Sequence, residues 1–264
     1  METAGDSVVL RHRDLEKIAN AALRVGRVIM ECGGRVRVVR EGMRLVAQGL
    51  GVEVIGERVG YASLALTVGH GEETITRMID VGPHGVNCRL DVAVRRLAIT
   101  TADAGGTVQG VNAALDKLTR ETPHYPLWAV APATGLACAA FARLLGADWA
   151  AFLPVLLAGS IGQWTRAKLR ARGVNLCLIA VAIAFMAGVI GGIGAHFLGS
   201  ASAETALIAS TLLLVPGVPA TNAQTDIMEG FPTVGSARAV SVAMIMVFAT
   251  LGIWGAEAVM GMLP

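Results

Sequence analysis

Hydrophobic and polar positions alternate first at helical and then at strand spacing through the first part of the chain. Apolar residues recur every three to four positions from Asp14 to the Gly33-Gly34 pair, which predicts an amphipathic helix ending at these glycines. A second helix is predicted from Arg35 to Leu50. The remaining predicted elements are three β-branched strands and two helices, at residues 52–55, 61–68, 74–81, 90–104 and 107–119. Together they predict a small α+β domain.

Beyond residue 125, long stretches without charge replace this alternation. Each is close to or within the roughly 17 to 25 residues that a membrane-spanning helix needs, and tryptophans lie near their ends. The five predicted membrane helices cover approximately residues 127–145, 149–165, 174–198, 204–220 (broken, and continuing to 230) and 237–260. The pattern predicts an α-helical polytopic membrane protein with about five transmembrane helices at 125–264, preceded by an α+β cytosolic domain at 1–124.

Composition and charge agree with this division. Hydrophobic residues make up 54% of the 264 residues, and 31 of the 42 charged residues precede residue 127. Basic and acidic side chains are nearly balanced in that first part, so nothing favours a nucleic-acid partner. The four cysteines are far apart and the histidines lack metal-ligand spacing, which indicates reduced thiols and no metal site.

The short loops predict how the helices are oriented in the membrane. The link TRAKLRARG at 165–173 carries four basic residues and no acid, and basic short loops stay in the cytoplasm. Two predicted spans separate this link from the N-terminal domain, so that domain also lies in the cytoplasm. We therefore expect a multi-pass protein of the plasma (inner) membrane, in contact with the lipid bilayer.

The stretch from Thr211 to Arg238 carries the densest polar chemistry of the apolar part. Pro216, Gly217 and Pro219 interrupt a helix there, and such interruptions persist at membrane depth only where protein or a wet cavity satisfies the freed backbone groups. Asn222 and Asp226 are four residues apart and share a helical face, beside Thr221 and Thr225. Buried acids at membrane depth usually mark a pathway or proton relay, and a helix-end hydrogen bond by Asp226 is the structural alternative.

Several sequence strings resemble the threonine/serine exporter family. They are LVPGVPATNAQTDIMEG followed by Gly-Ser-Ala-Arg, GGRVRVVREGMRLVAQGLG in the second predicted helix, and VNCRLDVAVRRL before the Gly105-Gly106 pair. The resemblance implies the long subunit of the split form of the family, which works with a short membrane subunit. It also implies export of threonine and serine, or of a dicarboxylate such as succinate.

A carboxylate substrate suggests a role for each candidate residue. Amides near residues 217–220, with Arg238, would bind the carboxylate, and Asn222 with Thr221 would form hydrogen bonds. Asp226 would bind a substrate ammonium or a coupling proton. The predicted substrate-binding residues are Pro216, Gly217, Thr221, Asn222, Thr225, Asp226 and Arg238, with Asp226 also the coupling residue; no catalytic residue, metal or cofactor is predicted.

The sequence also bears on two other classes of function. A membrane-anchored sensor or regulatory subunit without transport of its own is the alternative. An intramembrane serine protease is disfavoured, because Ala158 replaces the first glycine of the GxSxG pattern around Ser160. No Walker A pattern is present, so a proton gradient is the expected energy source. An odd number of spans indicates a partner subunit or a homo-oligomer.

Overall fold

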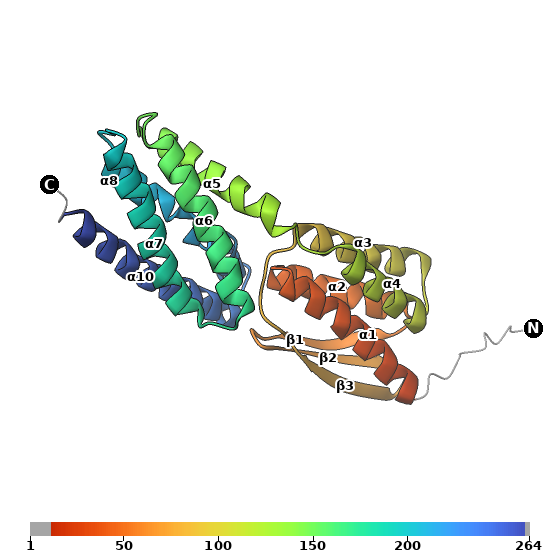
Figure 1. Cartoon of the computed structure of the whole chain (residues 1–264). Coiled ribbons are helices and arrows are strands. Elements are labelled where there is room, and N and C mark those ends of the chain that lie inside the picture. The colour runs from red at the N-terminus through yellow and green to blue at the C-terminus, as the bar shows by residue number, and fades with distance from the viewer. Residues whose placement is uncertain (1–11, 262–264) are drawn as a thin grey trace, which may run out of the picture. The chain divides into compact units, whose positions relative to one another are not determined.

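The computed structural model describes residues 12–261, and these residues form two compact units (Figure 1). The N-terminal unit comprises residues 12–124 together with 218–239, and the apolar unit comprises 125–217 together with 240–261. The chain is mostly helical, with one small sheet.

Two helices, a three-stranded sheet and two more helices make up most of the N-terminal unit. They are α1 (His12–Glu31), α2 (Val36–Gly49), β1 (Glu53–Val59), β2 (Ser63–His70), β3 (Glu73–Asp80), α3 (Cys88–Ala104) and α4 (Val108–Glu121). The sheet is antiparallel with β2 in the centre. β1 extends beyond the predicted 52–55, because its pairing with β2 continues to Val59 opposite Leu64. The α+β prediction for this part of the chain is confirmed.

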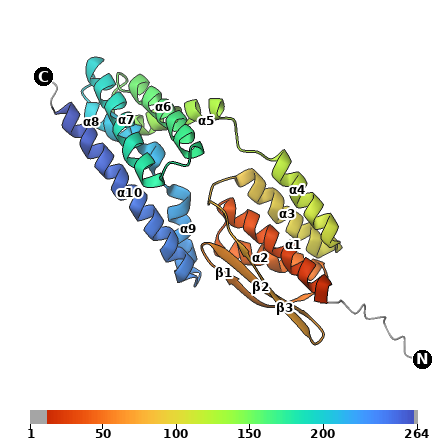
Figure 2. The same cartoon turned by 60° about the horizontal axis from the view of Figure 1, so that its bottom comes forward.

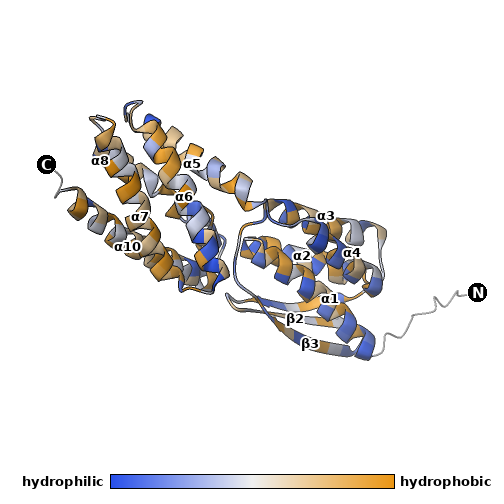
Figure 3. Ribbon diagram, in the orientation of Figure 1, coloured by the Kyte–Doolittle hydropathy of each residue, from blue (hydrophilic) through white to orange (hydrophobic). Residues whose placement is uncertain are grey.

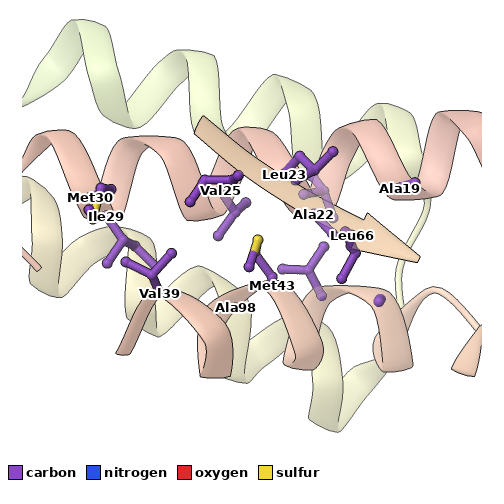
Figure 4. Close-up of a cluster of buried hydrophobic side chains, with 14 of the residues drawn as sticks. Ala19, Ala22, Leu23, Val25, Ile29, Met30, Val39, Met43, Leu66 and Ala98 are labelled. Carbon is purple, nitrogen blue, oxygen red and sulfur yellow. The ribbon is translucent and has the colours of Figure 1, made fainter. Parts of the chain in front are cut away.

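The core of this unit lies where α1 and α2 pack with the sheet. Along β2 the alternating residues Leu64, Leu66 and Val68 are buried, as a strand with one covered face requires. Figure 4 shows Leu66 among apolar side chains of the neighbouring helices, including Leu23 and Met43. Burying side chains of this size typically contributes about 1.5 to 3 kcal/mol each. This core fixes α1 and α2, and with them the turn that joins them.

The arginines of the N-terminal unit are largely engaged in local ion pairs. Arg40 and Arg44 both pair with Glu57, whose side chain is 3% exposed, at 2.8 and 2.5 Å. Arg95 pairs with Asp91 one turn earlier on α3. These contacts pair basic side chains with acids of the same unit, in line with the near balance of charge in this part of the sequence.

Helices alone make up the apolar unit. They are α5 (Leu127–Leu144), α6 (Phe152–Ala171), α7 (Leu176–Phe197), α8 (Ala203–Ser210), the 3-10 turn η1 (Leu212–Leu214) and the part of α10 (Pro232–Met260) from residue 240 onward. Figure 3 shows many strongly hydrophobic residues along these helices. Large apolar side chains such as Leu153, Phe185 and Trp254 are exposed, as lipid-facing positions are.

Three helices of the described residues, α5, α7 and α10, are long and apolar enough to cross a membrane. The interrupted pair formed by residues 203–214 and α9 (Gly217–Met228) adds a fourth if it counts as one span. α6 is not among them, since its last two turns carry Arg166, Lys168 and Arg170. A polytopic helical protein with three to four candidate spans is therefore the observed architecture, and a count of five stays a prediction.

Small residues hold the apolar unit together. A Cβ atom at Gly135 of α5 would collide with the carbonyl of Leu156 and the hydroxyl of Ser160 on α6. Similarly, a Cβ atom at Gly191 of α7 would overlap the side chain of Ser210 on α8. Close approach of helix backbones is the usual way in which membrane helices gain packing energy.

Candidate functional site

The predicted pair Asp226 and Arg238 forms a buried ion pair within the N-terminal unit. Arg238 Nη1 donates to Asp226 Oδ2 at 2.8 Å, and the two side chains are 5% and 0% exposed. The residues lie on α9 and at the start of α10, which run side by side in Figure 2. Between the helices the chain reverses at Gly230, whose φ of +89° favours glycine. This helical hairpin, residues 218–239, brings the two charges together.

The turn between α1 and α2 supplies the other partners of this pair. The N–H of Val36 donates to Asp226 Oδ1 at 2.9 Å, and Arg238 Nη2 donates to the Gly34 carbonyl at 2.8 Å. Val36 is the first residue of α2, where amides lack partners inside the helix and where the helix dipole favours a negative charge. Both oxygens of Asp226 are therefore engaged by donors that stabilise its charge.

Asn222 reaches the same turn. Its Nδ2 donates to the Gly33 carbonyl at 2.7 Å. The turn can present its carbonyls because Gly33 adopts φ +91°. A Cβ atom at Gly33 would also lie 2.8 Å from the Gly85 carbonyl oxygen, so a larger residue meets both a strained backbone and a close contact. The Gly33-Gly34 pair, read from the sequence only as a helix end, is thus the surface on which the hairpin is bound.

Further contacts join the hairpin to the N-terminal unit around the ion pair. Arg35 lies 3.4 Å from Glu229, and the Arg40 guanidinium lies over the Phe231 ring at 5.2 Å. Phe231 and Val234 pack against the hydrophobic core of the N-terminal unit. The hairpin is consequently an integral part of this unit.

The remaining predicted site residues are two threonines of α9 and the two residues at the helix interruption. The hydroxyls of Thr221 and Thr225 donate to carbonyls of their own helix, at Val218 and Thr221. Pro216 and Gly217 belong to the apolar unit. The structure thus brings Asn222, Asp226 and Arg238 together around one turn.

Sequence reasoning missed Arg166, which contacts the helix interruption from α6. Its Nη1 donates to the Leu213 carbonyl at 2.7 Å. In a regular helix this carbonyl would accept an N–H three or four residues later, but Pro216 has no N–H and the Gly217 N–H donates to Val215 at 2.9 Å. Arg166 therefore supplies the donor that the interrupted helix lacks. From the sequence it was interpreted only as part of a basic loop.

Among residues 12–261 no group of three or more His, Cys, Asp or Glu side chains is arranged to hold a metal ion. His84 stacks on Tyr61 with ring centroids 4.4 Å apart, and its Nε2 lies 2.9 Å from the Tyr61 carbonyl oxygen. Burial lowers the pKa of this histidine, which favours the neutral ring.

Comparison with known sequences identifies the family. A family model described as "Putative threonine/serine exporter" (ThrE) matches residues 20–260. The chain belongs to this family. No solved structure matches it.

Two curated relatives carry a more specific name. The probable succinate transporter subunit YjjP of Escherichia coli strain K12 is 25% identical over 249 residues, which cover 90% of this chain and 95% of the relative. The protein of the same name from Klebsiella aerogenes is 24% identical over 230 residues, which cover 85% and 87%. The ThrE chain is thus similar along nearly its whole length to proteins named as transporters rather than enzymes, and the sensor alternative is not favoured.

Proposed function

We propose that this ThrE chain is the membrane subunit of an exporter for small carboxylate metabolites, either threonine and serine or a dicarboxylate such as succinate. The observation that carries the proposal is the family match over residues 20–260, together with two relatives named as succinate transporter subunits. The apolar unit, with its candidate spans, would provide the pathway.

In this proposal the membrane part has five spans: α5, α6, α7, the interrupted stretch at 204–220, and α10. The basic residues at the end of α6 support a cytoplasmic position for that end of the helix, in a chain of the inner membrane. The α+β domain then also faces the cytoplasm. Because the relatives are named as subunits, a short membrane partner, or a second copy of this chain, would complete the transporter.

Substrate binding is proposed at the helix interruption and on the hairpin, with Pro216, Gly217, Thr221, Asn222, Thr225, Asp226 and Arg238 as the residues involved. In the conformation described, Asp226 and Arg238 bind each other and the turn at residues 33–36. Substrate would therefore bind to this pair in a second conformation, in which the pair has separated. Uptake of a proton by Asp226 would remove the charge that holds Arg238, and in this way would couple transport to the proton gradient.

The test is transport by inside-out vesicles from a deletion strain of the native host complemented with the chain, which retains whatever partner the cell supplies. Vesicles with the wild-type chain should accumulate labelled succinate, threonine or serine, and vesicles from the deletion strain should not. Dissipating the proton gradient should abolish the difference. Equal accumulation by both kinds of vesicle for all three solutes would refute the proposal.

Proton coupling has its own test in the same vesicles. Asp226→Asn keeps the shape of the side chain and removes its titratable group. If the variant transports at the wild-type rate with the wild-type pH dependence, Asp226 does not carry the proton.

A further inference from the structure

The guanidinium of Arg166 has one hydrogen-bond partner among residues 12–261, the Leu213 carbonyl, which binds Nη1. The Arg166 side chain is half-buried, and in the described residues neither Nε nor Nη2 has a hydrogen-bond partner or is fully buried. These two nitrogens form one edge of the planar guanidinium and carry parallel N–H groups. This edge is the one that binds a carboxylate in the bidentate, side-on arrangement.

No acid neutralises Arg166 in the described part of the chain. None of the ion pairs found there involves this residue. Of the acids in the apolar unit, Asp148 is held by Ser200 Oγ at 2.8 Å and by backbone N–H groups. Glu204 and Glu257 line a separate cavity of about 460 Å³. Arg166 is thus a partly buried cation whose charge is not compensated.

Arg238 shows the opposite arrangement. Its guanidinium is 5% exposed and is occupied by Asp226, the Gly34 carbonyl and the Met30 sulfur. A substrate carboxylate could bind there only after Asp226 is displaced. The guanidinium of Arg166 thus has N–H groups available to an anion, whereas the guanidinium of Arg238 is already bound by other groups.

We propose that Arg166 binds a carboxylate group of the exported solute at the helix interruption, through its Nε and Nη2 groups. This inference rests on the proposed function and names a residue of its binding site. The hydrogen bond from Nη1 to the Leu213 carbonyl fixes the plane of the Arg166 guanidinium. The side chain therefore loses less conformational entropy when a carboxylate binds. Threonine, serine and succinate all carry a carboxylate. Arg166 would therefore bind any of these solutes through that group, and other residues would discriminate among them.

The test measures the concentration dependence of uptake into inside-out vesicles for whichever of the three solutes the wild-type chain transports. Arg166→Gln should raise the apparent KM about 10- to 100-fold, as expected for the loss of charge-assisted hydrogen bonds, and should change the maximal rate less than about twofold. Arg166→Lys keeps the charge and loses the fork, so its KM should lie between those of the wild type and the glutamine variant. Arg172→Gln is the control, because it removes an exposed arginine from the end of the same helix.

The outcomes separate this inference from the proposed function. Absence of transport by the wild-type chain refutes the function and this inference with it. Transport by the wild type with an unchanged KM in Arg166→Gln refutes the inference alone. If the glutamine variant does not accumulate in the membrane because the Leu213 carbonyl has lost its donor, the lysine variant decides. A direct role for Arg166 is then refuted if the KM of Arg166→Lys equals that of the wild type. It is also refuted if Arg172→Gln raises the KM as much as Arg166→Lys does.

Discussion

Arg238 Nη1 and Asp226 Oδ2 are 2.8 Å apart in a region that excludes solvent from both side chains. The pair is joined to the α1–α2 turn through Val36 and Gly34. A buried ion pair of this kind is not itself strong evidence of stability, because the desolvation of two charges offsets their attraction. Removing one partner is different, since it leaves the other charge buried without compensation.

Asp226→Asn is therefore expected to reduce the free energy of unfolding by about 3 to 5 kcal/mol. The measurement is thermal or denaturant unfolding of the purified chain in detergent. Glu229→Gln is the matched control: it lies on the same hairpin in a more exposed pair with Arg35, and its effect should stay below about 1 kcal/mol. Equal effects in the two variants would show that the buried pair has no special role.

Replacing both charges should be milder than replacing either one. The double variant Asp226→Leu with Arg238→Met puts apolar groups of similar size in place of the pair, and such replacements are often neutral or stabilising. We expect the double variant to unfold at a higher denaturant concentration than either single variant. A loss equal to the sum of the two single losses would mean that the two side chains do not interact.

Gly33→Ala should destabilise the turn that holds the hairpin by about 1 to 3 kcal/mol, because the residue adopts φ +91° and its Cβ would approach the Gly85 carbonyl oxygen. Gly51→Ala separates these two causes. Gly51 also has a positive φ, +84°, but a Cβ atom there would meet no atom within 4 Å. Unfolding curves of both variants should show the larger loss for Gly33. A larger loss at Gly51 would contradict this account.

Thiol labelling should distinguish the cysteines of the N-terminal unit. Burial, reinforced by the nearby carboxylates of Asp91 and Glu31, raises the pKa of Cys32 to about 12, whereas Cys88 is exposed. Because the thiolate is the reactive form, iodoacetamide at pH 8 should modify Cys88 rapidly and leave Cys32 intact until the chain unfolds. Peptide mass spectrometry over a time course measures both rates. Labelling of Cys32 at the rate of Cys88 would contradict the structure.

His84 should make the stability of the N-terminal unit depend on pH. Burial lowers its pKa in the folded state, so the folded chain binds this proton more weakly than the unfolded chain. The contribution of the neutral ring is present above the unfolded pKa of about 6.5 and is lost as the pH falls through the folded value. Unfolding midpoints between pH 7.5 and 5 should fall more steeply for the wild type than for His84→Asn. Parallel curves would exclude this histidine as the cause.

Local structure was largely predictable from the sequence, whereas the contacts of the candidate site were not. Periodicity located the helices and strands of the first part of the chain, and Pro216 marked the helix interruption. The contact between Asp226 and Val36 joins residues 190 positions apart, and no periodic pattern encodes such a pairing. The contact of Arg166 with the Leu213 carbonyl was equally unpredictable. The sequence around a basic residue near a helix end does not show whether its side chain faces water or binds a backbone carbonyl.

The uninterrupted helix α10 has a mechanical consequence. Its first turns, with Arg238, belong to the N-terminal unit, and its remaining turns belong to the apolar unit. A helix of 29 residues is about 44 Å long, and α10 continues over this length without a break. If the ion pair between Asp226 and Arg238 separates, as proposed above, the residue that is released lies in the same unbroken helix as a candidate span, so no loop intervenes between them.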